Sequence, residues 1–334
     1  METLVRSATL NGFVTVARSV GLDPHALIRE VGLDPAALVN TDVRLRVSKV
    51  CELMDLAASR ANCPSLGLQM AQQRHALDFG LLGVLMAHKR SLRDMWQTAI
   101  EYHYLANDAL AIGLDVQGQV AVLRHELMVD MPAPLVQATE LSAGVIVRSC
   151  QAVLGATWHP RSVQFEHPAP ADTRWHRQVF ACPLQFGGEM NEIVLSVADL
   201  DAANPSADPA LVRYAESLAR PQNATAPDIA LQEVRQAVFM LLPIDGGASI
   251  ERVATHLHLS VRTLQRRLDH AGSSFSSEVN AVRRDLVQRY MKNPKYTLGR
   301  IAALLGYTRQ GSFTRWFIDQ FGVAPKDWRA RTAA

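Results

Sequence analysis

Two short stretches near the end of the chain carry arginine and glutamine side chains at helical spacing. The polar residues concerned are Arg262, Gln265 and Arg266 in the first stretch, and Arg309, Gln310, Ser312 and Arg315 in the second. An arginine fork can donate to O6 and N7 of guanine, and a glutamine amide can bridge N6 and N7 of adenine. These residue types therefore predict base reading in the DNA major groove, and an ordinary solvated helix face is the alternative for any single one of them.

The segments that must position these side chains form an internal duplication. "SIERVATHLHLSVRTLQRRL" aligns with "TLGRIAALLGYTRQGSFTRWF", and seven apolar positions agree after one residue is inserted in the second turn. In each copy the apolar residues recur with the period of a helix, first in a leading helix and then in a following one. Leu264 and Leu268, with Phe313 and Phe317, should turn inward, so the basic residues between them should face outward. This layout predicts two helix-turn-helix motifs.

The residues around these motifs suggest how they are held and charged. Ser260 and Thr308 stand where a helix N-cap belongs, and we expect both to contact DNA phosphates. Between the motifs, "SFSSEVNAVRRDLVQRYMKNP" predicts a linker helix of about 17 residues, roughly 25 Å long. Such a rod would hold the two recognition helices about one DNA turn, or 34 Å, apart. Arg283 on this rod and Lys295 just after it are expected phosphate contacts, with packing of the rod as the alternative.

The charge distribution supports an anionic partner. The 334 residues carry a net charge of +2, but residues 232–334 hold 16 Lys and Arg against 8 Asp and Glu. Subtraction from the totals of 34 and 32 leaves 18 against 24 in residues 1–231. A basic tail on an acidic body is typical of a nucleic-acid-binding module. A basic surface without a partner is the alternative.

Composition and motifs exclude several other classes of protein. With 48% hydrophobic residues, the chain can form a full hydrophobic core without a stabilising disulfide or structural metal ion. The four cysteines form no CxxC, and no long apolar run predicts a signal peptide or a membrane span, so we expect a cytoplasmic protein. No P-loop, HExxH, GxSxG or dinucleotide fingerprint occurs, so we expect no cofactor, no metal ion and no catalytic residue.

The first two thirds of the chain mix helical and strand patterns. Amphipathic helical periodicity alternates with strand-like segments, and "LAIGLDVQGQVAVLRHEL" reads as a hairpin around Gln117 and Gly118. We therefore predict an α+β N-terminal domain over residues 1–205 and a linker rich in Pro, Ala and Asp over residues 206–231. An all-α C-terminal domain with two helix-turn-helix motifs, joined by a linker helix, follows over residues 232–331.

A small-molecule pocket in the first domain is the remaining candidate site. Tyr102, His103 and Tyr104 precede the hairpin and could line such a pocket, although core packing is the simpler interpretation. Arg124 lies in the middle of a predicted strand, where an inward arginine could bind a carboxylate. A surface position for Arg124 is the alternative.

The second motif resembles the C-terminal signature of the AraC/XylS family of bacterial transcription regulators. The resemblance covers about residues 231–331 and rests on these residues: Gly306-Tyr307, Ser312-Phe313, Arg315-Trp316-Phe317, Phe321-Gly322, Pro325 and Trp328-Arg329. It implies that the base-reading positions fall on Arg262, Gln265 and Arg266 and on Arg309, Gln310, Gly311 and Arg315. Gly311 departs from the family pattern, in which a longer polar side chain is frequent.

The N-terminal half resembles, over fewer residues, the sensor domain of the branch with ornithine- and arginine-type regulators. "HALDFGLLGVLMAHKRSLRDMWQTAIEYHYLAND" and "CPLQFGGEMNEIVLSVADLDAANPSADPAL" carry this likeness. It implies an arabinose-binding-type domain that binds a small-molecule effector and pairs subunits into a homodimer. The expected protein is a ligand-responsive activator on promoter DNA, with RNA polymerase open as a further partner. The rival is an alkyl-transfer DNA-repair enzyme with the same tail, which would need an activated cysteine or metal ligands.

Overall fold

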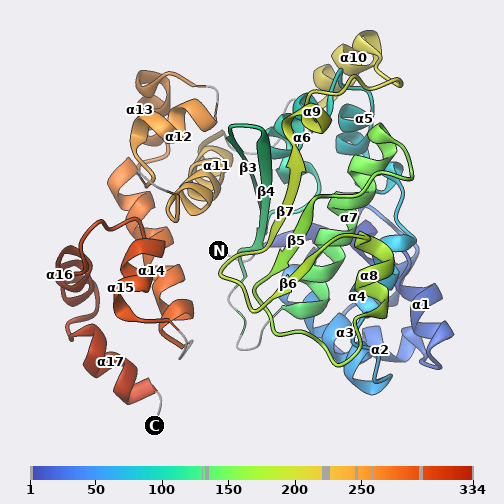
Figure 1. Cartoon of the computed structure of the whole chain (residues 1–334), viewed down its shortest axis with the longest axis horizontal. Coiled ribbons are helices and arrows are strands. Elements are labelled where there is room, and N and C mark those ends of the chain that lie inside the picture. Colours follow the sequence, from blue (N-terminus) through green and yellow to red (C-terminus); the bar gives the residue numbers. More distant parts are fainter. Residues whose placement is uncertain are drawn as a thin grey trace. The chain divides into compact units, whose positions relative to one another are not determined.

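The chain divides into two compact units, Met1–Arg220 and Pro221–Ala334 (Figure 1). The computed structural model describes all residues except 1–2, 130, 132–134, 220–225, 245–246, 258, 293–295 and 333–334. The first unit mixes helices with strands, and the described part of the second is helical, so the predicted α+β and all-α classes are confirmed.

The first half of the first unit is mainly helical. Its elements are β1 (Leu4–Arg6), η1 (Ser7–Leu10), α1 (Phe13–Ser19), α2 (Pro24–Glu30), η2 (Pro35–Leu38), β2 (Arg44–Arg46), α3 (Val47–Arg60), α4 (Leu66–Gln72), η3 (Ala76–Phe79), α5 (Leu81–Ala87), α6 (Leu92–Glu101) and η4 (His103–Leu105). Strands β1 and β2 pair antiparallel. Aspartates cap α2 and η2 by accepting a backbone N–H, and Pro24 and Pro35 begin these helices, where the missing N–H costs nothing.

The second half of the first unit contains the main sheet. Its elements are β3 (Leu110–Gln117), β4 (Val120–Leu127), α7 (Val136–Leu154), β5 (Ser162–Phe165), α8 (Arg174–Phe180), β6 (Leu184–Phe186), β7 (Glu192–Ser196), α9 (Val197–Leu200) and α10 (Pro209–Ala219). The strands follow the order β3-β4-β7-β5-β6, and only the β5–β6 pair is parallel. The predicted hairpin is confirmed, with Gly118 at φ 61° in its turn, a conformation that favours glycine.

Helix α7 connects two hydrophobic cores within the first unit. Leu141 packs with the helical core of α1 to α4, whereas Ile146 and Val147 pack with the core between the sheet and its covering helices. Figure 1 shows α7 beside the sheet, with α4 and α8 close to it. Gly67 of α4 lies so close to Gln137 of α7 that a Cβ there would meet its carbonyl oxygen at 2.1 Å. The two helices therefore hold both cores in one body.

The first unit extends beyond residue 205, where the sequence analysis had ended it. Helix α10 belongs to this unit because Ala215 and Ala219 are buried against α5. Lys89 Nζ also forms an ion pair with Glu216 Oε1 at 2.8 Å. The predicted linker over residues 206–231 is therefore too long: its first half is a docked helix.

The second unit consists, in its described part, of helices joined by short turns. They are α11 (Ala226–Leu241), α12 (Ile250–His256), α13 (Val261–His270), α14 (Phe275–Lys292), α15 (Leu298–Leu304), α16 (Gln310–Phe321) and α17 (Pro325–Thr332). Helix α11 opens this unit, since its Val234 and Val238 are buried and its Arg235 pairs with Glu278 of α14. The second unit thus begins before residue 232, inside the stretch predicted to be linker.

Candidate DNA-binding surface and effector cavity

The first helix-turn-helix consists of α12 and α13, each capped by a serine. Ser249 accepts from the N–H of Arg252, and Ser260 accepts from the N–H of Thr263 at 3.1 Å. Ser260 Oγ also lies 2.8 Å from Thr263 Oγ1. The predicted cap at Ser260 is confirmed, and it fixes where α13 begins.

The two faces of α13 differ as the sequence predicted. Leu264 and Leu268 are 0% and 1% exposed, so they anchor the helix to the core. Arg262, Gln265 and Arg266 are exposed on the other side. Arg267 instead turns toward α11, with Nη1 3.5 Å from Glu233 Oε2. Helix α13 therefore presents a polar face that combines two guanidinium groups with one amide.

The second helix-turn-helix, α15 and α16, repeats this layout with one change. Thr297 caps α15 by accepting from the N–H of Arg300. The N-cap of α16 is Arg309, which has an extended backbone and no side-chain cap, so the predicted cap at Thr308 is wrong. The inserted residue in this turn explains the difference: the position equivalent to Ser260 moves from Thr308 to Arg309. Thr308 is exposed just before the helix.

Helix α16 buries its aromatic residues and exposes its polar ones. Phe313 and Phe317 are 0% and 1% exposed. The polar residues predicted to face outward are all exposed: Arg309, Gln310, Ser312 and Arg315. At Gly311 an added Cβ would meet nothing within 4 Å. Gly311 therefore contributes no polar group to the exposed face and leaves open space there.

Helix α14 braces the second motif. Its 18 residues correspond to about 27 Å at the rise of an α-helix. Asn280 Oδ1 accepts from Trp316 Nε1 of α16 at 2.9 Å, and Arg284 Nη1 donates to Gln320 Oε1 of α16 at 2.8 Å. Ser274 caps the helix by accepting from the N–H of Ser277. The linker helix that the sequence predicted, α14, is therefore a strut that side-chain hydrogen bonds fix to α16.

Arg283 of α14 serves this packing instead of pointing to solvent as a phosphate contact would. Its Nε donates to the carbonyl of Leu305 at 3.0 Å, and its guanidinium carbon lies 4.2 Å from the centroid of the Tyr307 ring. Burial lowers the pKa of Arg283 and raises that of Tyr307 to about 12. For Arg283 the packing alternative therefore applies, while Lys295 lies outside the described residues.

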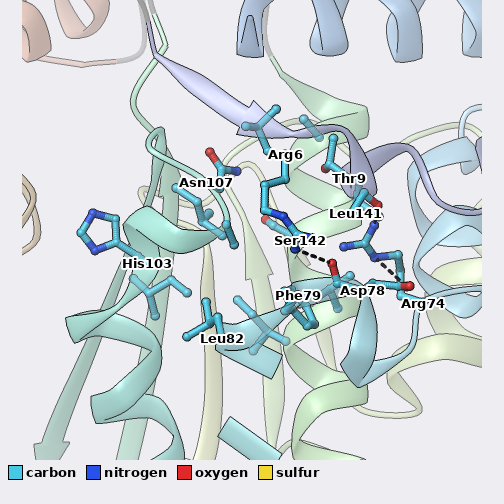
Figure 2. A pocket seen from close by; sticks show the side chains of 18 of the residues that line it. Arg6, Thr9, Arg74, Asp78, Phe79, Leu82, His103, Asn107, Leu141 and Ser142 are labelled. Atoms are coloured by element: carbon cyan, nitrogen blue, oxygen red, sulfur yellow. Dashed lines mark hydrogen bonds and ion pairs between the residues drawn. The ribbon is translucent and has the colours of Figure 1, made fainter. Parts of the chain in front are cut away.

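The first unit contains a cavity of about 120 Å³ that is partly open to solvent. Its walls come from the β1–η1 segment, α3, the turn around η3, α6, the β3–β4 hairpin and α7. Figure 2 shows Arg74 and Asp78 near one end of it and His103 near the other. His103 lines the cavity, as the sequence analysis considered, and burial lowers its pKa to about 4, so it is neutral at pH 7.

The other three residues proposed for this pocket lie elsewhere. Tyr102 packs toward α5 and α10, and Tyr104 Oη donates to the carbonyl of Ala219 at 3.2 Å. Because side chains alternate along a strand, Arg124 faces away from the inward His125. It lies directly opposite Glu192 of β7 and donates to its carboxylate at 2.7 Å. Tyr102, Tyr104 and Arg124 are therefore corrected to packing and ion-pair roles.

The charged residues that do line the cavity are Arg6, Arg74 and Asp78, and the sequence analysis missed them. Arg6 comes from β1, whereas the other two precede and enter η3. Arg74 and Asp78 are four residues apart, which is the one sequence signal that could have indicated a pair. Arg6 could not be placed with them, because 68 residues of chain separate it from Arg74.

The cysteines are poorly suited to nucleophilic chemistry. Burial raises the pKa of Cys51 and of Cys150 to about 12 and that of Cys182 to about 11. Since the thiolate is the nucleophile, these three thiols are inert at neutral pH. Cys63 is buried as well. None of the three cysteines with a raised pKa is activated as the alkyl-transfer alternative requires.

Two kinds of feature are absent from the described part of the chain. It contains no group of three or more His, Cys, Asp and Glu that could hold a metal ion. None of the helices in that same part is both long and apolar enough to cross a bilayer.

A basic unit with two helix-turn-helix motifs, joined to an α+β unit with a largely apolar cavity, defines a DNA-binding regulator with a ligand-sensing domain. Residues 21–204 match the family described as the arabinose-binding domain of AraC transcription regulator, and residues 253–331 match a helix-turn-helix domain. The chain belongs to the AraC family of transcription regulators.

Several transcriptional regulators are similar to this chain along most of its length. The HTH-type transcriptional regulator VirS of Mycobacterium tuberculosis is 27% identical over 337 residues, which cover 99% of this chain and 97% of VirS. The ornithine utilization regulator of Pseudomonas aeruginosa is 26% identical over 267 residues, covering 80% of this chain and 78% of that protein. The crystal structure of the transcriptional regulator CdpR from Pseudomonas aeruginosa is 19% identical, with a TM-score of 0.46 over 92% of this chain and 96% of that one.

Proposed function

We propose that the chain is an effector-responsive transcriptional activator that reads two adjacent major-groove segments of promoter DNA with α13 and α16. The observation that carries this proposal is that both helices have one buried apolar face and one exposed polar face. In both, the apolar anchors are at most 1% exposed, and every polar residue expected to read bases is exposed. The alternative, an ordinary solvated surface helix, does not predict that this arrangement recurs in both copies of a duplicated motif.

Base reading is assigned to side chains of both helices. Arg262, Gln265 and Arg266 act from α13, and Arg309, Gln310, Ser312 and Arg315 act from α16 or its N-cap. A bidentate pair of this kind discriminates against a wrong base by about 1–3 kcal/mol. Two such helices on one chain would therefore recognise a site of two half-sites without a second protein.

Phosphate contacts orient the protein without reading sequence. Ser260 and Thr308 stand at or just before the recognition helices, where hydroxyl and backbone donors can meet a phosphate. Lys295 is assigned the same role from its charge and its place in the sequence after α14. Its replacement by alanine should lower affinity for all sequences alike and reduce the salt slope by about 1.

The first unit, residues 1–220, is proposed to bind the effector in its cavity and to pair two chains into a homodimer. The DNA-binding unit then runs from α11 to α17. An effector can shift promoter occupancy only by its difference in affinity between the active and inactive arrangements. Contact with RNA polymerase would convert this shift into activation. Because the proposed partner is chromosomal DNA, we place the protein in the cytoplasm.

Paired substitutions test the base-reading roles. Promoter fragments beside the gene, or a random DNA library, provide the target, and Arg266→Ala and Arg315→Ala provide one change in each recognition helix. Each should relax the preference at one half-site only, by about 1–3 kcal/mol per base pair. Arg267→Ala is the matched control, since Arg267 neighbours Arg266 in the sequence but turns toward Glu233. Uniform weakening on all sequences by either of the first two variants would refute base reading.

A further inference from the structure

The cavity of the first unit is apolar over most of its wall. Val47 and Met54 of α3, Trp96 of α6 and Leu141 and Ile146 of α7 are among the buried side chains that face it. An apolar cavity of about 150 Å³ in another protein takes up benzene, so a cavity of comparable size suits one ring or a short acyl chain. The wall thus favours a ligand with an apolar body.

One end of the same cavity carries charge. Arg74 is 8% exposed, its Nη1 donates to the carbonyl of Ala8, and its guanidinium carbon lies 5.4 Å from the centroid of the Phe79 ring. Its Nε is buried without a hydrogen-bond partner, 3.5 Å from Asp78 Oδ2. This ion pair leaves the buried N–H without a hydrogen-bond acceptor, which is costly and points to a group that completes it when present.

Asp78 forms an ion pair with Arg74, and each of its oxygens also accepts a hydrogen bond from a neutral donor. Oδ1 accepts from Asn11 Nδ2 at 2.7 Å, and Oδ2 accepts from the N–H of His75 at 2.9 Å. Arg6 adds a second cation by donating to the backbone carbonyl of Asp78. The carboxylate that pairs with Arg6 is Asp42, whose side chain is 78% exposed and therefore screened by water.

The two arginines also act on each other. The pKa of Arg74 falls to about 10, first because of burial, with Asp78 opposing the shift and Arg6 adding to it. This end of the cavity thus holds two guanidinium groups against one lining carboxylate, that of Asp78. A bound anion would relieve both the burial cost and the repulsion.

Building on the effector role proposed for this cavity, we propose that the effector is an organic monocarboxylate with an apolar body. Its carboxylate accepts from Arg74 Nε beside Arg6, both labelled in Figure 2. Its ring or acyl chain lies along the wall of α3, α6 and α7. Arg74 is thereby a ligand-binding residue and the determinant of specificity for acids.

Two other ligand classes fit this cavity poorly. A sugar carries a hydroxyl on almost every carbon, and each one buried without a partner costs free energy that an apolar wall does not return. A free amino acid would bring an ammonium group, and the carboxylate that lines the described cavity, Asp78, is already engaged. The proposed ligand is therefore an acid, not the sugar that the description of the N-terminal domain family would suggest.

Calorimetric titration of the full chain at pH 7 tests the proposal without any mutation. The probes are octanoate, octan-1-ol as its uncharged counterpart, L-arabinose and L-ornithine. We expect octanoate to bind at least about tenfold more tightly than octan-1-ol, because a charge-assisted hydrogen bond to a buried arginine distinguishes them. Equal affinity for acid and alcohol, binding of arabinose or ornithine instead, or no binding of octanoate would each overturn the proposal.

Variants then assign the preference to Arg74. Arg74→Met should remove the difference between octanoate and octan-1-ol, whereas Arg90→Met, at a side chain that is 81% exposed in the same unit, should keep it. A folded Arg74→Met protein that retains the difference would overturn the assignment, and the wild-type comparison stands even if this variant does not fold. DNA binding is measured on the same samples. Sequence-specific DNA binding without octanoate binding would refute only the proposed ligand class. Octanoate binding without sequence-specific DNA binding would refute only the DNA-binding proposal.

Discussion

Arg283 offers a sharp test of how the second unit is held together. Its Nε donates to the carbonyl of Leu305 at 3.0 Å, and its guanidinium stacks on Tyr307 at 4.2 Å. A hydrogen bond from a charged donor is worth about 1.5–3 kcal/mol, and a cation–π contact about 0.5–2 kcal/mol. Because Arg283 is only half-buried, the lower part of both ranges applies. We expect Arg283→Ala to destabilise the second unit by about 2–3 kcal/mol.

Differential scanning calorimetry of the full chain measures this loss. The unfolding transition of the second unit is identified as the one whose midpoint temperature rises when DNA is bound. A loss of that size should lower its midpoint by roughly 10 °C. Arg283→Lys should be destabilised too, because an ammonium cannot donate and stack as the planar guanidinium does. Arg284→Ala is the control, since Arg284 makes an exposed hydrogen bond to Gln320 and should cost under about 1 kcal/mol.

The salt dependence of DNA binding separates the two roles considered for Arg283. If it packs the strut, the salt slope of Arg283→Ala, measured where the variant is folded, should equal that of the wild type. If it contacts a phosphate, the slope should fall by about 1, and Arg283→Lys should restore it. An unchanged midpoint together with a reduced slope would refute the packing role.

Other consequences follow from particular contacts. Gly67→Ala should destabilise the first unit by about 3 kcal/mol or more in urea unfolding, because the new Cβ would lie 2.1 Å from the backbone oxygen of Gln137. Gly311→Ala should instead stabilise the second unit by about 0.5–1 kcal/mol, since its Cβ meets nothing, and a loss there would contradict the placement of this face. Burial lowers the pKa of His125 to about 3 and that of His103 to about 4, below the unfolded value near 6.5. The unfolded chain therefore binds more protons below pH 6.5. The free energy of unfolding should therefore be highest above pH 6.5. Between pH 6.5 and 5 each of these histidines should lower it by up to about 1.4 kcal/mol per pH unit. His125→Gln should flatten this dependence, whereas His159→Gln, at an exposed position, should not.

Sequence patterns predicted the features that depend on local periodicity and turn chemistry. The burial of Leu264 and Phe313, the cap at Ser260 and the β3–β4 hairpin all follow from spacing along one stretch of chain. The cap at Thr308 was misplaced by one residue, because the alignment of the two copies did not carry the insertion through to the cap.

Features that depend on distant segments could not be predicted in this way. Arg124 faces Glu192 because β4 pairs with β7 in a register that no local pattern specifies. The charged end of the cavity joins Arg6 to Arg74 and Asp78 through the packing of β1 against the turn at η3. The composition of residues 206–231 predicts only a linker, and the docking of helix α10 on α5 is visible only in the folded unit.

Hydroxyl-radical footprinting on a selected promoter tests most directly whether α13 and α16 read two successive major-groove segments. We expect two protected segments on one face of the DNA, with centres about one helical turn, or 34 Å, apart. Arg266→Ala should weaken one segment and Arg315→Ala the other. A single protected segment, or two segments that both variants weaken equally, would contradict the reading of DNA by two helices held on one strut.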